Sequence, residues 1–272
     1  MRLAKWLTVL VMLLLPLVFS AQAQERSGGK IGVLLLHGKN PGSPNTPSLN
    51  ILQKRLEREG MITRMPDMPW SAKRYIDGDW DKAMAEIDGH VQALRKAGAE
   101  RIVLIGHSMG CPASMGYAVR PNSAVDAIVL LAPGHVPSAY FNLASLKTVR
   151  DSILEARRLV AEGQGATRKD FIDNNQGQFQ KVRITAQAYL SYFDPEGDAE
   201  MSRTAPRIPA QVPVLLAIGN EDPLFGRARS FIFDALPANP KSRYLEAEAN
   251  HVSTPSVVAD DVAAWIVGAL SP

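Results

Sequence analysis

The chain has 272 residues and a nearly balanced charge, with 30 Lys and Arg against 27 Asp and Glu. No block of basic residues could track a phosphate backbone, so no nucleic-acid partner is expected. The single cysteine, Cys111, excludes an intramolecular disulfide and a zinc site built from several cysteines. No metal or organic cofactor is expected.

The first 23 residues predict a secretory signal peptide. Arg2 and Lys5 precede an apolar run at 6–19, and Ala-Gln-Ala at 21–23 has the pattern of a cleavage site. The apolar run is shorter than the roughly 20 residues that a membrane-spanning helix needs. We therefore expect an exported protein, periplasmic or secreted. No transmembrane span is expected in its mature chain, residues 24–272.

Short runs rich in Leu, Ile and Val alternate with longer amphipathic stretches. Strands are predicted at 30–37, 61–65, 101–107, 125–133, 212–219 and 242–248. Helices are predicted at 47–60, 79–98 and 255–270, the second with Asp79 as its N-cap and Gly98 as its terminator. The alternation predicts an α/β fold with a mostly parallel, doubly wound sheet, in one domain over residues 24–272.

The segment between the fourth and fifth predicted strands breaks this alternation. Residues 145–163 and 170–193 both have patterns typical of helices, and glycines and polar residues separate them. A structureless loop of this length would be unusual in a compact domain. The sequence therefore predicts a helical cap, inserted late in the sheet at about residues 135–210.

The pentapeptide Gly106-His107-Ser108-Met109-Gly110 predicts a nucleophilic serine. Gly-x-Ser-x-Gly alone is weak evidence, because it occurs by chance in about one chain in ten of this length. Here it follows the strand at 101–107 and precedes a stretch of small residues suited to a packed helix. Such a strand-to-helix turn requires small residues two positions before and after the serine, and both are glycine. Cys111 is interpreted as a packing residue under this turn.

A serine hydroxyl needs a positioned base, and His251 is the best candidate. It lies on a loop between the last predicted strand and the last helix, at the edge of the sheet that Ser108 occupies. His107 should point away from the serine hydroxyl, and His37 closes the first strand, where a structural hydrogen bond is expected. His90 lies on an amphipathic helix, and His135 at the cap entrance stays a second candidate.

The base requires a carboxylate that orients it and stabilises its protonated form. Asp222 follows the strand at 212–219 and is our choice, with Glu221 as the alternative; Asp126 begins its strand and lies at the opposite edge. The predicted oxyanion hole consists of two backbone N–H groups, those of Met109 and Lys39. Only the backbone of Lys39 is needed there, so its side chain is expected in solvent.

These features together resemble the α/β-hydrolase superfamily over residues 30–270. The resemblance rests on "HGKN" after the first strand, "GHSMG" at the turn, "NEDP" after a late strand and a histidine before the last helix. The chain order Ser108, Asp222, His251 also matches the family, as does the place of the cap. The sheet is expected to be reduced, because cleavage near residue 23 leaves little room for the family's first antiparallel hairpin.

The sequence and this resemblance predict a serine hydrolase that cleaves an ester-like acyl bond through an acyl-enzyme. A carboxylesterase acting on a small-molecule or acyl substrate is favoured. A peptidase or acyltransferase with the same triad stays open, as does a non-catalytic binding protein of the cell envelope. Candidate substrate-binding residues are Trp70, Phe141, Tyr189, Tyr192 and Phe193. The alternative role for these aromatic side chains is to pack the cap onto the sheet domain.

Overall fold

The computed structural model describes residues 29–39 and 41–271 of the chain. The predicted signal peptide lies outside these residues. Within them, no helix combines the length and the apolar character that crossing a membrane requires.

The predicted strands form one sheet in the described part of the chain. They are β1 (Ile31–Leu36), β2 (Ile62–Arg64), β3 (Arg101–Ser108), β4 (Ala127–Pro133), β7 (Val214–Gly219) and β8 (Arg243–Ala247). The sheet has the order β2-β1-β3-β4-β7-β8, and each neighbouring pair is parallel. The predicted parallel, doubly wound sheet is confirmed. The strand order reverses between β1 and β3, and in open α/β sheets such a reversal leaves a crevice at the carboxyl ends of the strands.

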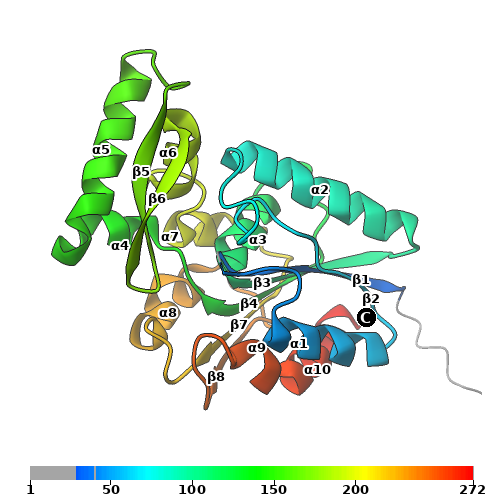
Figure 1. The fold of residues 1–272 in the computed structure, drawn as a ribbon. Coiled ribbons are helices and arrows are strands. Elements are labelled where there is room, and N and C mark those ends of the chain that lie inside the picture. Colours follow the sequence, from blue (N-terminus) through cyan, green and yellow to red (C-terminus); the bar gives the residue numbers. More distant parts are fainter. Residues whose placement is uncertain (1–28, 40, 272) are drawn as a thin grey trace, which may run out of the picture.

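Helices cover both faces of the sheet (Figure 1). One face carries α1 (Pro47–Arg58), α9 (Thr254–Val257) and α10 (Ala259–Leu270), and the other carries α2 (Trp80–Lys96) and α3 (Gly110–Ala118). Successive side chains of β1 point to opposite faces of the sheet. Val33 and Leu35 pack with the apolar residues of α1 and α10, and Leu34 and Leu36 pack with those of α2. A short helix, α8 (Phe225–Phe231), and a 3₁₀ turn, η3 (Phe233–Ala235), follow β7.

The predicted signals at the ends of α2 are confirmed. The Asp79 side chain accepts a hydrogen bond of 2.8 Å from the Lys82 amide at the first turn. Gly98 follows the last turn with a φ of +96°, in the left-handed region that favours glycine. The apolar face of α2 is buried against the sheet, with Met84, Ile87 and others in its core cluster.

The segment between β4 and β7 stands beside the sheet as a cap (Figure 1). It contains α4 (Pro137–Asn142), η1 (Ala144–Leu146), α5 (Lys147–Ala161), β5 (Arg168–Asn175), β6 (Gln178–Thr185), α6 (Ala186–Phe193), α7 (Met201–Thr204) and η2 (Ala205–Arg207). The predicted helix at 145–163 is confirmed as α5. The predicted helix at 170–193 is wrong over most of its length, because β5 and β6 form an antiparallel hairpin there.

Period-two burial explains why this segment is a hairpin. Phe171 and Asp173 on β5 are buried, as are Val182 and Ile184 on β6, while the residues between them are more exposed. The strands are joined by Gln176 and Gly177 with φ values of +51° and +80°. Two successive residues with positive φ match the twist of a tight antiparallel hairpin.

Candidate active site

Ser108 ends β3 in a strained conformation. Its φ is +53°, in the left-handed region that residues other than glycine rarely occupy. A Cβ at Gly106 would lie 2.2 Å from the Gly110 carbonyl oxygen, and one at Gly110 would lie 2.0 Å from the Leu36 carbonyl oxygen. Backbone atoms block both positions, so the turn requires glycine on either side of the serine.

His251, which is partly exposed, pairs with the buried Asp222 beside this turn. Nδ1 of His251 lies 2.7 Å from Oδ2 of Asp222, whose side chain is 1% exposed. Because a carboxylate only accepts, Nδ1 carries the hydrogen and Nε2 of the neutral ring is left as a proton acceptor. The other Asp222 oxygen, Oδ1, accepts from the Leu224 amide at 2.8 Å, which fixes the carboxylate. Glu221, the alternative acid, is exposed, so the pair favours Asp222.

Gly134, directly after β4, connects the serine and the histidine. A Cβ at this position would lie 2.7 Å from Ser108 Oγ and 3.4 Å from His251 Cε1. Ser108 Oγ and the His251 ring therefore border the same small space. A side chain at position 134 would fill that space.

These residues open into one cleft with a volume of about 610 Å³. Lys39, Ser108, Met109, Asp222 and His251, the five residues predicted for the triad and the oxyanion hole, all line it. Apolar walls come from Val136, Ala139, Tyr140, Leu146 and Leu224, and amide side chains from Asn174, Asn175, Gln176 and Asn250. The β5–β6 turn thus forms part of the cleft wall.

Two reactive-looking neighbours of Ser108 have structural contacts. Nε2 of His107 donates to the His251 carbonyl oxygen at 2.9 Å, so His107 supports the histidine loop. Burial lowers the pKa of His107 to about 4, and the ring is neutral at neutral pH. The Cys111 thiol donates to the Gly106 carbonyl oxygen at 3.1 Å, and burial raises its pKa well above the ordinary value. A protonated, buried thiol is a poor nucleophile.

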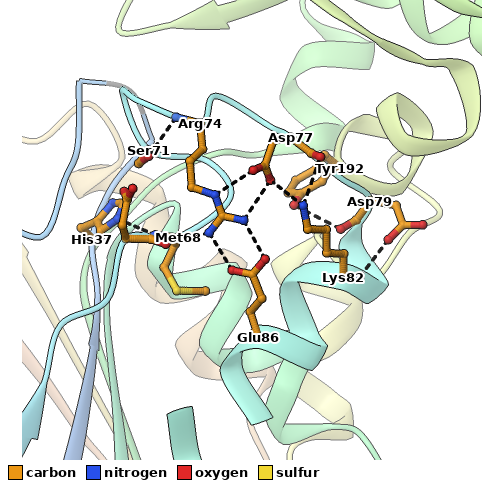
Figure 2. A network of polar contacts seen from close by, with 10 residues as sticks. His37, Met68, Ser71, Arg74, Asp77, Asp79, Lys82, Glu86 and Tyr192 are labelled. Atoms are coloured by element: carbon orange, nitrogen blue, oxygen red, sulfur yellow. Dashed lines mark hydrogen bonds and ion pairs between the residues drawn. The ribbon is translucent and has the colours of Figure 1, made fainter. Parts of the chain in front are cut away.

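His37 holds the loop that follows β1. Its Nδ1 donates to the Gly38 carbonyl oxygen at 2.8 Å, and its Nε2 accepts from the Met68 amide at 3.1 Å (Figure 2). Trp70 adds a third contact, because its indole N–H donates to the His37 carbonyl oxygen at 2.8 Å. The ring nitrogens of His37 are therefore engaged in structure, as the sequence predicted.

The aromatic residues predicted to bind substrate do not reach the cleft in the described part of the chain. Trp70, Tyr189, Tyr192 and Phe193 are fully buried, and Tyr189 stacks on Phe193 with ring centroids 4.3 Å apart. Phe141 packs against the Arg157 guanidinium, 5.1 Å from its ring centroid. These five predictions are corrected: the side chains build the cap core and its seat on the sheet domain.

The sequence reasoning missed two features of the cleft. The Lys39 side chain, expected in solvent, is 3% exposed and paired with Asp173. The amide-bearing turn at 174–177 was missed because its segment was interpreted as helix. The available signal was the alternation of Val182, Ile184 and charged residues after a glycine.

Comparisons with known proteins agree with this architecture. The sequence profile of the Alpha/beta hydrolase family matches residues 33–265. A comparison with curated proteins finds no match.

Similar solved structures include Est1E from Butyrivibrio proteoclasticus with ferulic acid bound, at a TM-score of 0.66 and 16% identity, covering 89% of this chain and 90% of that one. A monoacylglycerol lipase from Paleococcus ferrophilus aligns at a TM-score of 0.60 and 22% identity, covering 88% of this chain and 94% of that one. A structure from work on LipS and LipT, described as metagenome-derived lipolytic enzymes, aligns at a TM-score of 0.57 and 17% identity, covering 89% of this chain and 94% of that one. At these identities the likeness concerns the fold, and together with the profile match over most of the sequence it shows that the chain belongs to the alpha/beta hydrolase family.

Proposed function

We propose that the protein is an exported serine hydrolase that cleaves carboxylic esters through an acyl-enzyme. The observation that carries the proposal is the hydrogen bond of 2.7 Å between the buried Asp222 and His251, in a cleft that also holds Ser108. The strained backbone of Ser108 supports it, because strain of this kind persists only where the surroundings enforce it. Export rests on the sequence of the first 23 residues alone.

The reaction begins when Ser108 Oγ attacks the ester carbonyl carbon and His251 Nε2 takes the hydroxyl proton. The carbonyl π electrons move to oxygen, and the resulting oxyanion accepts hydrogen bonds from the Lys39 and Met109 amides. Collapse of this intermediate breaks the bond to the leaving alcohol, which His251 protonates. Water then attacks the acyl-enzyme by the same steps and releases the acid. Asp222 stabilises the His251 ring in the intermediates in which it carries the extra proton.

The lining of the cleft supports a neutral substrate with an apolar part. Its walls combine mostly apolar side chains with neutral amides. Outside the predicted triad the described lining residues include one cation, Lys39, which is already paired with Asp173, and one carboxylate, Glu221, which is exposed. Buried apolar walls bind hydrocarbon, and a few polar groups orient a ligand. The fold likeness to Est1E with ferulic acid bound and to proteins described as lipolytic enzymes is compatible with an ester substrate.

A substrate panel tests the proposal. Purified mature protein would be assayed with p-nitrophenyl esters of rising acyl length and, in parallel, with aminoacyl p-nitroanilides. We expect turnover of the esters, little turnover of the anilides, and loss of turnover in Ser108→Ala. Preferential anilide cleavage would indicate a peptidase, and acyl transfer to an added alcohol in preference to water an acyltransferase. No turnover of any compound would favour a non-catalytic binding protein.

A further inference from the structure

A buried ion pair joins the loop after β1 to the cap. Lys39 Nζ lies 2.7 Å from Asp173 Oδ1, across 134 residues of sequence, and the two side chains are 3% and 0% exposed. Burial lowers the pKa of the Lys39 ammonium, whereas the neighbouring Asp173 carboxylate raises it. The proposed ester chemistry uses neither side chain. The backbone of Lys39, however, is the predicted oxyanion donor.

Asp173 also binds a third segment. The Tyr75 hydroxyl donates to its other oxygen, Oδ2. The rings of Tyr140 and Phe193 each lie 5.6 Å from Lys39 Nζ, so aromatic faces surround the ammonium. One carboxylate thus connects the β1 loop, the loop before α2 and strand β5 of the cap.

The segment that carries Tyr75 is itself held in place. Tyr75 and Ile76 have φ values of +25° and +58°, and a β-branched residue adopts the left-handed region only under constraint. Contacts on both sides hold the segment: the Ile76 amide donates to the Pro69 carbonyl oxygen, and the Arg74 guanidinium contacts Asp77 at 2.8 Å and Glu86 of α2 at 2.6 Å (Figure 2). Tyr75 is therefore presented to Asp173 from a fixed backbone.

Stability alone does not account for this arrangement. Removing two charges from water is costly, and apolar residues of similar volume often replace a buried ion pair without loss of stability. The pair does fix two features of the cleft at once. Lys39 anchors the loop whose amide faces the oxyanion in the proposed reaction, and Asp173 directly precedes the lining turn at 174–177.

We propose that Lys39, Asp173 and Tyr75 form a latch that positions the oxyanion loop against the seated cap. The latch rests on the proposed function, and its members are positioning residues, because they act through the Lys39 backbone. Small displacements of a hydrogen-bond donor are costly in catalysis, so a loosened loop lowers the rate of acyl transfer more than substrate binding.

The first test is Asp173→Asn, with Asp170→Asn as its matched control. Asp170 lies on the same strand, but its carboxylate is exposed and contacts Arg183 at 3.1 Å. We expect Asp173→Asn to lower kcat on a short p-nitrophenyl ester about 10- to 100-fold with KM changed less than about threefold, since loss of one oxyanion donor costs about 10²–10³. Asp170→Asn should match the wild type.

Phenylboronic acid provides a readout that a merely structural role would not move. It forms a tetrahedral adduct on a nucleophilic serine, and one boronate oxygen occupies the position of the oxyanion. The latch predicts that its inhibition constant rises in Asp173→Asn by about the factor by which kcat/KM falls, because both measure tetrahedral-state binding. Unchanged boronate affinity and unchanged kcat in folded Asp173→Asn would overturn the latch.

A double variant distinguishes a role of the Lys39–Asp173 pair in positioning the oxyanion loop from a role in stability alone. It can be used even if Asp173→Asn is too unstable to assay. Lys39→Met combined with Asp173→Leu removes both charges, keeps the Lys39 backbone amide and retains apolar volume. We expect its thermal midpoint to return to the wild-type value while kcat stays reduced; recovery of both would show that the pair only holds the cap. If a fluorophosphonate probe does not label the wild-type protein, the proposed function itself is overturned. If the wild type is labelled but the latch variants behave like it, only the latch is overturned.

Discussion

Ser108, Asp222 and His251 belong to the sheet half of the cleft, where Ser108 ends one parallel strand and the other two follow strands. The turn at 174–177 and helix α4 form its cap half. The sheet half is fixed by backbone topology, because the carboxyl ends of parallel strands, and the residues that follow them, lie at the same edge of the sheet. The cap half is fixed by side-chain contacts between distant segments, such as Asp173 with Lys39.

Under the proposed function, this difference assigns the chemical steps and the substrate selectivity to different parts of the chain. Substitutions in the sheet half are expected to change the rate of the chemical steps. Substitutions in the cap half are expected to change substrate binding or stability, with the latch as the point where the halves are coupled. The predictions below test that division, from the largest expected effect to the smallest.

The largest effect is expected at Asp222 in the sheet half. Asp222→Asn removes the acceptor that fixes the His251 tautomer, and kcat should fall by about 10⁴-fold, or about 5.5 kcal/mol in activation free energy. Steady-state ester hydrolysis measures it. The control is Glu221→Gln, an exposed neighbour that should change kcat less than about threefold. A larger loss in Glu221→Gln than in Asp222→Asn would move the acid by one residue.

The next largest effect is a loss of unfolding free energy at acid pH. It is caused by two buried histidines, one in the sheet half and one in the cap half. Burial lowers the pKa of His107 to about 4 and that of His135, at the cap entrance, to about 3, from 6.5. Below pH 6.5 the unfolded chain therefore binds more protons, and the free energy of unfolding falls with pH. Each histidine contributes a slope of about 1.4 kcal/mol per pH unit, and this slope ends near its folded pKa.

Urea unfolding of His107→Gln and His135→Gln between pH 7 and pH 3 checks this. The first variant should flatten the curve down to about pH 4, and the second down to about pH 3. Curves parallel to the wild type would show that these rings are protonated in the folded protein.

A smaller effect is expected at Trp70, which the structure removes from the substrate site. Trp70→Phe deletes the donor to the His37 carbonyl oxygen and leaves that buried oxygen unpaired, at a cost of about 1–3 kcal/mol in unfolding free energy. KM for esters should stay within about twofold, because Trp70 does not line the cleft. A large rise in KM with unchanged stability would return Trp70 to the substrate site.

The smallest effect is expected at the cap turn. Gln176 has a φ of +51°, and asparagine tolerates this region several-fold better than glutamine. Gln176→Asn should raise the free energy of unfolding by about 0.5 kcal/mol, measured as a higher thermal midpoint. A lower midpoint would show that Gln176 contributes a contact that outweighs its strain.

The sheet and the residues at its strand ends could be predicted from the sequence for a physical reason. Strands buried on both faces are continuous apolar runs, and the residue after each run has a fixed edge of the sheet. Ser108, Asp222 and His251 were predicted in this way, and the structure brings them together in one cleft.

The cap could be predicted only in outline. Its hairpin is exposed on one face, so its charged residues resemble an amphipathic helix, and Gln176-Gly177 is a weaker turn signal than Asn-Gly. The Lys39–Asp173 pair joins residues that no local pattern relates. Exposure of an aromatic residue such as Tyr189 likewise depends on tertiary packing and leaves no signal in the nearby sequence.

Labelling with a fluorophosphonate probe, followed by intact-mass and peptide analysis, tests the central claim that Ser108 is an activated nucleophile. The account predicts one covalent adduct per chain, located on Ser108, formed at a rate that falls steeply in Asp222→Asn and is lost in Ser108→Ala. An unlabelled wild-type protein, or a Ser108→Ala variant labelled as fast as the wild type, would contradict it.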